Sequence, residues 1–121
     1  MIRGIRGAIT VKENTSDMIL TATKKLIMKM IVENHIKPDA VAQVIMTVTN
    51  DLNAAFPAKA LRELENWNYV PVMCMQEIPV PNSLEMCIRV MMTVETELSQ
   101  DEINHIYLER AVILRPDLAN Q

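Results

Sequence analysis

Hydrophobic and polar residues alternate along several short segments of the chain, and elsewhere hydrophobic residues recur at every third or fourth position. A period of two is typical of strands, and a period near 3.6 is typical of helices. Four segments have the alternating pattern or an apolar, β-branched run, and they are predicted strands: 2–9, 41–49, 70–75 and 84–96. Pro71 indicates that the third of these strands begins at a sheet edge or a bulge.

Two helices are predicted in the first half of the chain. The longer one begins near Thr15 or Ser16 and ends at Asn34, before Pro38. Its apolar stripe, at helical spacing, consists of Ile19, Ala22, Leu26 and Met30. The shorter helix covers residues 56–64 and has a proline in its first turn, where the missing amide hydrogen is not needed.

A third helix is predicted after residue 99. Ser99 and Glu102 have the spacing of a capping box, which opens a helix. The residues expected on this helix are Ile103, Ile106, Tyr107 and Arg110. A last short strand is predicted at 111–114.

This order of elements indicates an α+β fold, in which a mixed β-sheet has helices packed on one side. The chain of 121 residues is expected to form a single domain, 1–121. Several strands are apolar on both faces, whereas the helices can cover only one face. We therefore expect the other face to be buried against copies of the same chain.

Composition limits the possible partners. Hydrophobic residues make up 50% of the chain and aromatic residues 3%, with ten methionines, so the core should be aliphatic and rich in sulfur. The cations are spread along a chain of net charge −3, which excludes a typical nucleic-acid binder. No apolar stretch reaches the roughly 18 residues that a membrane span needs. Cys74 and Cys87 are expected to be reduced thiols of a cytoplasmic protein.

Arg6 stands in the apolar segment 2–9 and Arg89 in the apolar segment 87–94, and neither segment contains an acidic residue. A guanidinium keeps its proton, so a partly buried one needs an anion. The only glycines, Gly4 and Gly7, flank Arg6, and Gly4, Arg6 and Ala8 share one strand face, which clears space around the arginine. We interpret both arginines as sites for a negatively charged ligand, the alternative being an intramolecular salt bridge for each.

The sequence lacks the motifs of several common kinds of binding and catalytic site. Two glycines exclude a glycine-rich nucleotide loop, and no serine stands in a nucleophile elbow. His35 and His105 are not spaced as metal ligands. The remaining polar candidates are Arg6, Lys59, Arg62, Arg89, Cys74, Glu77 and Tyr107. Because arginine forks bind carboxylates with two hydrogen bonds, these residues indicate a binder of a small acid with more than one carboxylate.

Ordinary structural interpretations of the same residues stay open. Lys59 and Arg62 can form a solvated helix face, and Cys74 can be a small core residue. Tyr107 can pack on the sheet, and Glu77 can be a surface loop carboxylate.

Five blocks of sequence, in the same order and spread over nearly the whole chain, resemble the monofunctional chorismate mutases of the Bacillus type. The blocks are 1–8, 56–64, 69–77, 87–94 and 106–118. The resemblance implies an isomerase that catalyses the Claisen rearrangement of chorismate to prephenate, in the shikimate pathway to phenylalanine and tyrosine. It also implies a homotrimer with a pseudo-α/β barrel core, active sites between subunits, and no cofactor or metal.

The resemblance also implies roles for individual residues. Arg6 and Tyr107 would bind a substrate carboxylate, and Arg89 would contact the ether oxygen and a carboxylate. Glu77 and the thiol of Cys74 would address the ring hydroxyl. Phe56, Lys59, Arg62 and Leu114 would close the cleft from the adjoining subunit, Arg115 would lie near its mouth, and Met73 replaces an expected small polar residue.

Two alternatives remain at this stage. Imine-hydrolysing deaminases resemble the same trimeric architecture and also place an arginine between subunits. A trimer that binds a small anion without turnover, as a sensor or scaffold, is the other alternative.

Overall fold

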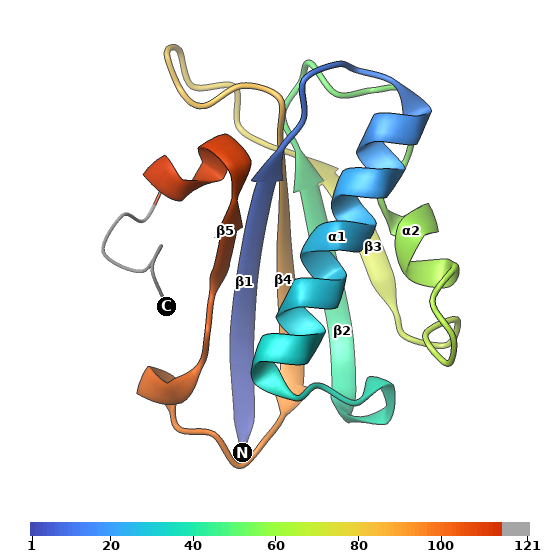
Figure 1. The fold of residues 1–121 in the computed structure, drawn as a ribbon, viewed down its shortest axis with the longest axis vertical. Coiled ribbons are helices and arrows are strands. Elements are labelled where there is room, and N and C mark those ends of the chain that lie inside the picture. Colours follow the sequence, from blue (N-terminus) through green and yellow to red (C-terminus); the bar gives the residue numbers. More distant parts are fainter. Residues whose placement is uncertain (115–121) are drawn as a thin grey trace.

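The computed structural model describes residues 1–114, which form a five-stranded mixed sheet with two α-helices on one face (Figure 1). The strands are β1 (Ile2–Thr10), β2 (Val41–Val48), β3 (Val72–Gln76), β4 (Cys87–Glu95) and β5 (Ile106–Leu108). The α-helices are α1 (Ser16–Asn34) and α2 (Ala58–Arg62), and short 3₁₀ turns cover Pro38–Ala40, Gln100–Glu102 and Glu109–Ile113. The predicted α+β class is confirmed.

The strands lie in the order β3-β2-β4-β1-β5. The two central pairings, β2 with β4 and β4 with β1, are antiparallel, whereas both edge strands pair in parallel with their neighbours. Pro71 precedes the edge strand β3, where a residue without an amide hydrogen breaks no ladder, as predicted.

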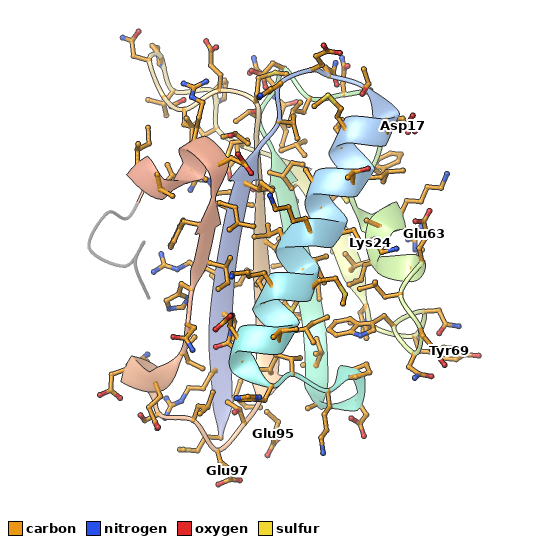
Figure 2. All side chains as sticks on the ribbon, in the orientation of Figure 1. Asp17, Lys24, Glu63, Tyr69, Glu95 and Glu97 are labelled. Carbon is orange, nitrogen blue, oxygen red and sulfur yellow. The ribbon has the colours of Figure 1, made fainter. Side chains whose placement is uncertain are left out.

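Helix α1 has the predicted limits. The Thr15 side chain accepts a hydrogen bond from the Met18 amide at 3.2 Å, which caps the first turn. His35 follows the last turn in the left-handed conformation, with φ 53°. Figure 2 shows the side chains of Asp17 and Lys24 directed away from the sheet, so the polar face of the helix is exposed.

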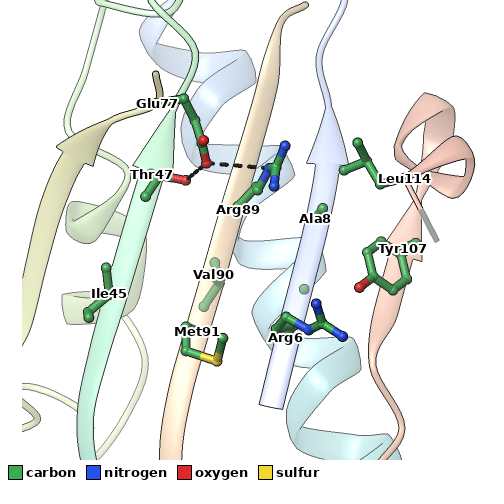
Figure 3. A pocket seen from close by; sticks show the side chains of 11 residues that line it. Arg6, Ala8, Ile45, Thr47, Glu77, Arg89, Val90, Met91, Tyr107 and Leu114 are labelled. Atoms are coloured by element: carbon green, nitrogen blue, oxygen red, sulfur yellow. Dashed lines mark hydrogen bonds and ion pairs between the residues drawn. The ribbon is translucent and has the colours of Figure 1, made fainter. Parts of the chain in front are cut away.

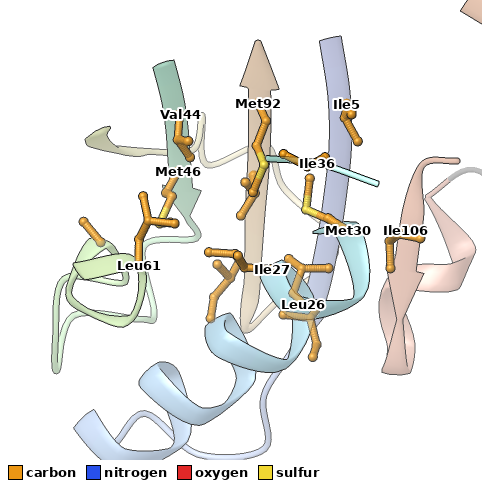
Figure 4. Close-up of a cluster of buried hydrophobic side chains, with 14 of the residues drawn as sticks. Ile5, Leu26, Ile27, Met30, Ile36, Val44, Met46, Leu61, Met92 and Ile106 are labelled. Carbon is orange, nitrogen blue, oxygen red and sulfur yellow. The ribbon is translucent and has the colours of Figure 1, made fainter. Parts of the chain in front are cut away.

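The main core lies between α1, α2 and the sheet, and it is aliphatic and rich in sulfur, as predicted. Figure 4 shows many of its members: Ile5, Leu26, Ile27, Met30, Ile36, Val44, Met46, Leu61, Met92 and Ile106. A second, smaller cluster lies around Ala8, Cys87, Tyr107 and Ala111. Because strand residues alternate between faces, Ile5 and Ile9 point toward α1 while Arg6 and Ala8 occupy the opposite face.

The predicted helix after Ser99 is wrong beyond its first turn. The capping box exists, with the Ser99 amide donating to Glu102 Oε1 at 2.9 Å, but the helix ends at Glu102. The segment Ile106–Leu108 is instead the strand β5, and Tyr107 lies on it. The predicted strand at 111–114 is also wrong, because Glu109–Ile113 forms a 3₁₀ turn.

A contact distant in sequence explains the first of these differences. The buried Asn34 side chain donates from Nδ2 to the Asn104 carbonyl at 2.9 Å and accepts from the Asn104 amide at 2.8 Å. These two hydrogen bonds form a clamp between Asn34 and Asn104, which holds the chain extended at the end of α1. The residues that follow Asn104 can then pair with the edge of β1 as strand β5. Tertiary pairing therefore overrides the local helix signal.

The predicted strand at 84–96 begins later than expected, at Cys87. Met86 has φ 54°, and its amide donates to both carboxylate oxygens of Asp51, at 3.2 and 3.0 Å. The carboxylate thus stabilises a turn that precedes the strand. None of the helices in residues 1–114 is long and apolar enough to cross a membrane.

The two glycines beside Arg6 should differ in how well they tolerate a larger side chain. A Cβ at Gly7 would lie 2.5 Å from Met30 Sδ and 3.0 Å from Leu26 Cδ1, so Gly7→Ala should lower the free energy of unfolding by about 1–3 kcal/mol. A Cβ at Gly4 would lie 3.3 Å from Sδ of the exposed Met91, so Gly4→Ala, the matched control, should change it by about 0.5 kcal/mol or less. Urea unfolding at a fixed protein concentration measures both, and equal effects would contradict the close packing at Gly7.

Candidate active site

Arg6 on β1 and Arg89 on β4 line a common cavity of about 310 Å³ on the sheet face opposite α1 (Figure 3). The predicted residues Glu77, Tyr107 and Leu114 also line it. The other lining residues are Gly7, Ala8, Ile45, Thr47, Val90 and Met91. The structure therefore brings together five of the predicted site residues from one chain.

Strand register explains why these side chains meet. Thr47 pairs with Arg89, Arg89 with Ala8, and Ala8 with Tyr107, so the four residues form one row across β2, β4, β1 and β5. In Figure 3 the Tyr107 hydroxyl is directed toward the Arg6 side chain. Ala8 is the small member of the row, and its short side chain leaves the hollow between its larger neighbours.

Arg89 is not unmatched, contrary to the interpretation from the sequence. Its Nε lies 3.3 Å from Glu77 Oε1, and the two side chains are 48% and 24% exposed. Glu77 follows β3, which is not a neighbour of β4, so the β4 segment gave no sign of this acid. Arg6 differs from Arg89 in this respect, because no acidic side chain within residues 1–114 lies at ion-pair distance from its guanidinium.

Two further contacts hold Glu77. Its amide donates to the Val48 carbonyl at 2.8 Å, which fixes its backbone to the end of β2. Its Oε1 accepts a hydrogen bond from the Thr47 hydroxyl, as well as the contact from Arg89 (Figure 3). The sequence interpretation did not single out Thr47, because a threonine in a strand is an ordinary residue.

His105 supports the backbone at Arg6. The pairing of β5 with β1 extends only from Gly7 to Ile9, and the Arg6 amide donates instead to His105 Nδ1 at 3.0 Å. From the sequence, His105 was weighed only as a possible metal ligand. Its position in the sequence gives no sign that it accepts a hydrogen bond from the Arg6 amide. Among the described residues, no group of three or more His, Cys, Asp or Glu side chains could hold a metal ion.

Cys87, rather than Cys74, is the cysteine beside the arginine cavity. It precedes Arg89 by two residues on β4 and is buried with Ala8 and Tyr107. Burial raises the pKa of the Cys87 thiol, and the positive charge and hydrogen bond of Arg89 oppose this effect in part. Cys74 pairs with Met46 and packs against the main core, so it faces the helix side of the sheet.

The remaining predicted site residues lie at the other edge of the sheet. Phe56 and Cys74 line a separate cavity of about 420 Å³ between the segment before α2 and β3. Lys59 and Arg62 are exposed on α2, and Met73 on β3 is 63% exposed. Leu114, expected to come from an adjoining subunit, lines the arginine cavity of its own chain instead, and Arg115 lies outside the described residues.

The fold is that of an α+β protein, and its cavity is lined by two guanidinium groups and one carboxylate. The family model for chorismate mutase type I matches residues 2–118. The chain belongs to the chorismate mutase type I family, and it is an isomerase that converts chorismate to prephenate in aromatic amino acid biosynthesis. The resemblance found in the sequence is confirmed.

Curated relatives and a solved structure agree with this assignment. The chain is 59% identical to chorismate mutase AroH of Bacillus subtilis (strain 168) over 119 residues, which cover 98% of this chain and 94% of the relative. It is 49% identical to chorismate mutase AroH of Thermus thermophilus, with 98% and 97% covered. The structure of a chorismate mutase from Clostridium thermocellum superimposes with a TM-score of 0.89 at 48% identity, over 92% of this chain and 98% of that chain.

The raised pKa of Cys87 predicts slow alkylation of the folded protein. The thiolate is the reactive species, and a higher pKa leaves less of it at a given pH, so iodoacetamide at pH 8 should modify Cys87 more than about tenfold more slowly than in the unfolded chain. Mass spectrometry of the Cys74→Ser variant, with and without guanidinium chloride, measures Cys87 alone. Equal rates in the two conditions would show that the thiol is neither buried nor perturbed.

Proposed function

We propose that the cavity around Arg6 and Arg89 is the chorismate site and that a second copy of the chain completes it. The observation that carries this proposal is the placement of two guanidinium groups on one sheet face, at the wall of a single cavity. A volume of about 310 Å³ is at the lower end of the range of small-ligand pockets. Chorismate carries two carboxylates, and arginine is the side chain best suited to them.

The reaction requires little of the protein except shape and charge. A pericyclic rearrangement is unimolecular and needs neither a nucleophile nor a proton transfer, so the enzyme must hold the dianion in a compact, chair-like conformer. Arg6 and the Tyr107 hydroxyl bind one carboxylate in this proposal. Arg89 contacts the other carboxylate and the ether oxygen, on which negative charge grows as its bond to the ring breaks.

Glu77 has the complementary role. The ring fragment becomes electron-poor as the ether bond breaks, and a carboxylate near the ring hydroxyl favours that change. Glu77 takes the Nε edge of Arg89, so the terminal nitrogen atoms of the guanidinium keep donors for the substrate. The two charged groups are thus held before the substrate binds, and little reorganisation is needed in the transition state.

We further propose the homotrimer with a pseudo-α/β barrel core that the resemblance implies. In it, the edge formed by α2 and β3 of one subunit covers the arginine cavity of the next and brings Phe56, Lys59, Arg62, Met73 and Cys74 to the substrate. Exposed apolar side chains on the open sheet face, Met73, Met75 and Met91, support this arrangement. The two free thiols are in keeping with a cytoplasmic enzyme.

The function is tested by the loss of chorismate absorbance in the presence of purified protein and its Arg89→Lys variant. Lysine is a point charge on a flexible stem and cannot reproduce the fork, so kcat should fall on the order of 10²-fold or more. Arg110→Lys, at an exposed position of the turn Glu109–Ile113, is the matched control and should keep wild-type turnover. Near-normal turnover of Arg89→Lys would remove Arg89 from the site.

The shared site is tested by mixing two impaired variants. Arg89→Lys alters the cavity side and Lys59→Met alters the α2 side, so mixed oligomers regain sites with both parts intact. In a cyclic trimer, random mixing in equal amounts leaves about one site in four unaltered. Differently tagged subunits allow isolation of the mixed species, whose activity and sedimentation are then measured. Mixed oligomers without recovered activity, or an active monomer, would contradict a site between subunits.

A further inference from the structure

Thr47 lies in the arginine cavity beside the ion pair of Glu77 and Arg89, with its hydroxyl directed at the carboxylate (Figure 3). It is half-buried on β2, directly opposite Arg89 in the antiparallel register. A strand threonine has restricted χ1 freedom because its Cβ is branched, so few directions are open to its hydroxyl. Its single proton is donated to Glu77 Oε1.

Glu77 is thus held at two points of the same strand. Its amide is bound to the Val48 carbonyl at 2.8 Å, and its side chain is bound to the hydroxyl of the preceding residue, Thr47. Three rotatable bonds separate the carboxylate from the backbone, and without the hydroxyl only the 3.3 Å contact with Arg89 Nε would restrain it. Thr47 therefore supplies the restraint that the backbone contact cannot.

The position of the shared oxygen matters for the substrate. Thr47 donates its hydrogen bond to Oε1, which is also the oxygen in ion-pair contact with Arg89 Nε, and within residues 1–114 no hydrogen bond reaches Oε2. An unrestrained carboxylate beside a guanidinium favours the two-pronged geometry, in which both oxygens bind parallel N–H groups. In that geometry Glu77 Oε2 would bind a terminal nitrogen of Arg89. Neither of these two atoms would then be available to a ligand.

We propose that Thr47 is a positioning residue that keeps Glu77 in single-point contact with Arg89. The inference rests on the proposed substrate site. The hydroxyl binds Oε1, which leaves Oε2 directed to the ring hydroxyl of the substrate and leaves the terminal nitrogens of Arg89 directed to the ether oxygen. Thr47 acts through Glu77 and does not touch the reacting atoms.

The test compares Thr47→Val, which keeps the shape and loses the hydroxyl, with Thr47→Ser, which keeps the hydroxyl. Thr47→Val should lower kcat by about 10-fold to 100-fold, as expected for misplacement of a charged group, and should change KM less than about threefold. Thr47→Ser should stay within about threefold of wild type in both constants. Because valine suits a strand as well as threonine does, the thermal midpoint should be unchanged.

A double-mutant cycle identifies the partner. In a Glu77→Gln background, Thr47→Val should cause less than half of its loss in the wild-type background, because the carboxylate that it positions is already gone. Wild-type kcat in Thr47→Val, equal impairment of the serine variant, or full additivity with Glu77→Gln would each overturn the proposal. The proposed site itself fails separately, through normal turnover of Arg89→Lys, so the two outcomes are distinguishable.

Discussion

The contact between Glu77 and Arg89 is the interaction on which the arrangement of the site depends. It joins the segment after the edge strand β3 to the central strand β4, across β2, through one 3.3 Å contact. An ion pair with one side chain about half exposed contributes little to the stability of the fold. Its effect is to fix the direction of two opposite charges at the wall of the cavity. The pair is thus better explained by the chemistry of the cavity than by the stability of the fold. Thr47, on the intervening strand β2, adds a hydrogen bond to the carboxylate of Glu77.

The two faces of the sheet differ in role, because one packs against the helices and the other carries the cavity. On the helix face, long side chains such as Ile5, Met46 and Met92 fill the space against α1, and Gly7 lets the helix approach closely. On the opposite face, short Ala8 stands between larger residues and leaves a hollow. Because neighbouring residues of a strand alternate between faces, one strand, β1, supplies both core residues and a cation of the cavity. A shift of its register by one residue would exchange the two roles.

The sequence predicted what depends on nearby residues. The Thr15 cap and the apolar stripe set the limits of α1, and the period of two placed Arg6 and Ala8 on one face. Strand β5 could not be predicted, because it depends on the clamp between Asn34 and Asn104, which are far apart in the chain. The partner of Arg89 could not be predicted either, because it depends on the order of strands in the sheet. The same is true of the cysteines, because only the strand pairings show that Cys87 is buried beside Ala8 and Tyr107 and that Cys74 lies on the helix side of the sheet.

The charge of the cavity supports its completion by another subunit. Arg6 and Arg89 contribute two positive charges and Glu77 one negative charge, so the charged lining residues within 1–114 sum to +1. Chorismate carries two negative charges, and burying it in this cavity alone would leave one of them without a matching cation, which is unfavourable away from water. Lys59 and Arg62 lie exposed on α2, at the opposite edge of the sheet. In the proposed trimer this edge meets the cavity of the neighbouring subunit, and either cation would balance the second charge. Electrostatic balance therefore supports the proposed oligomer, in addition to the exposed apolar side chains of the open sheet face.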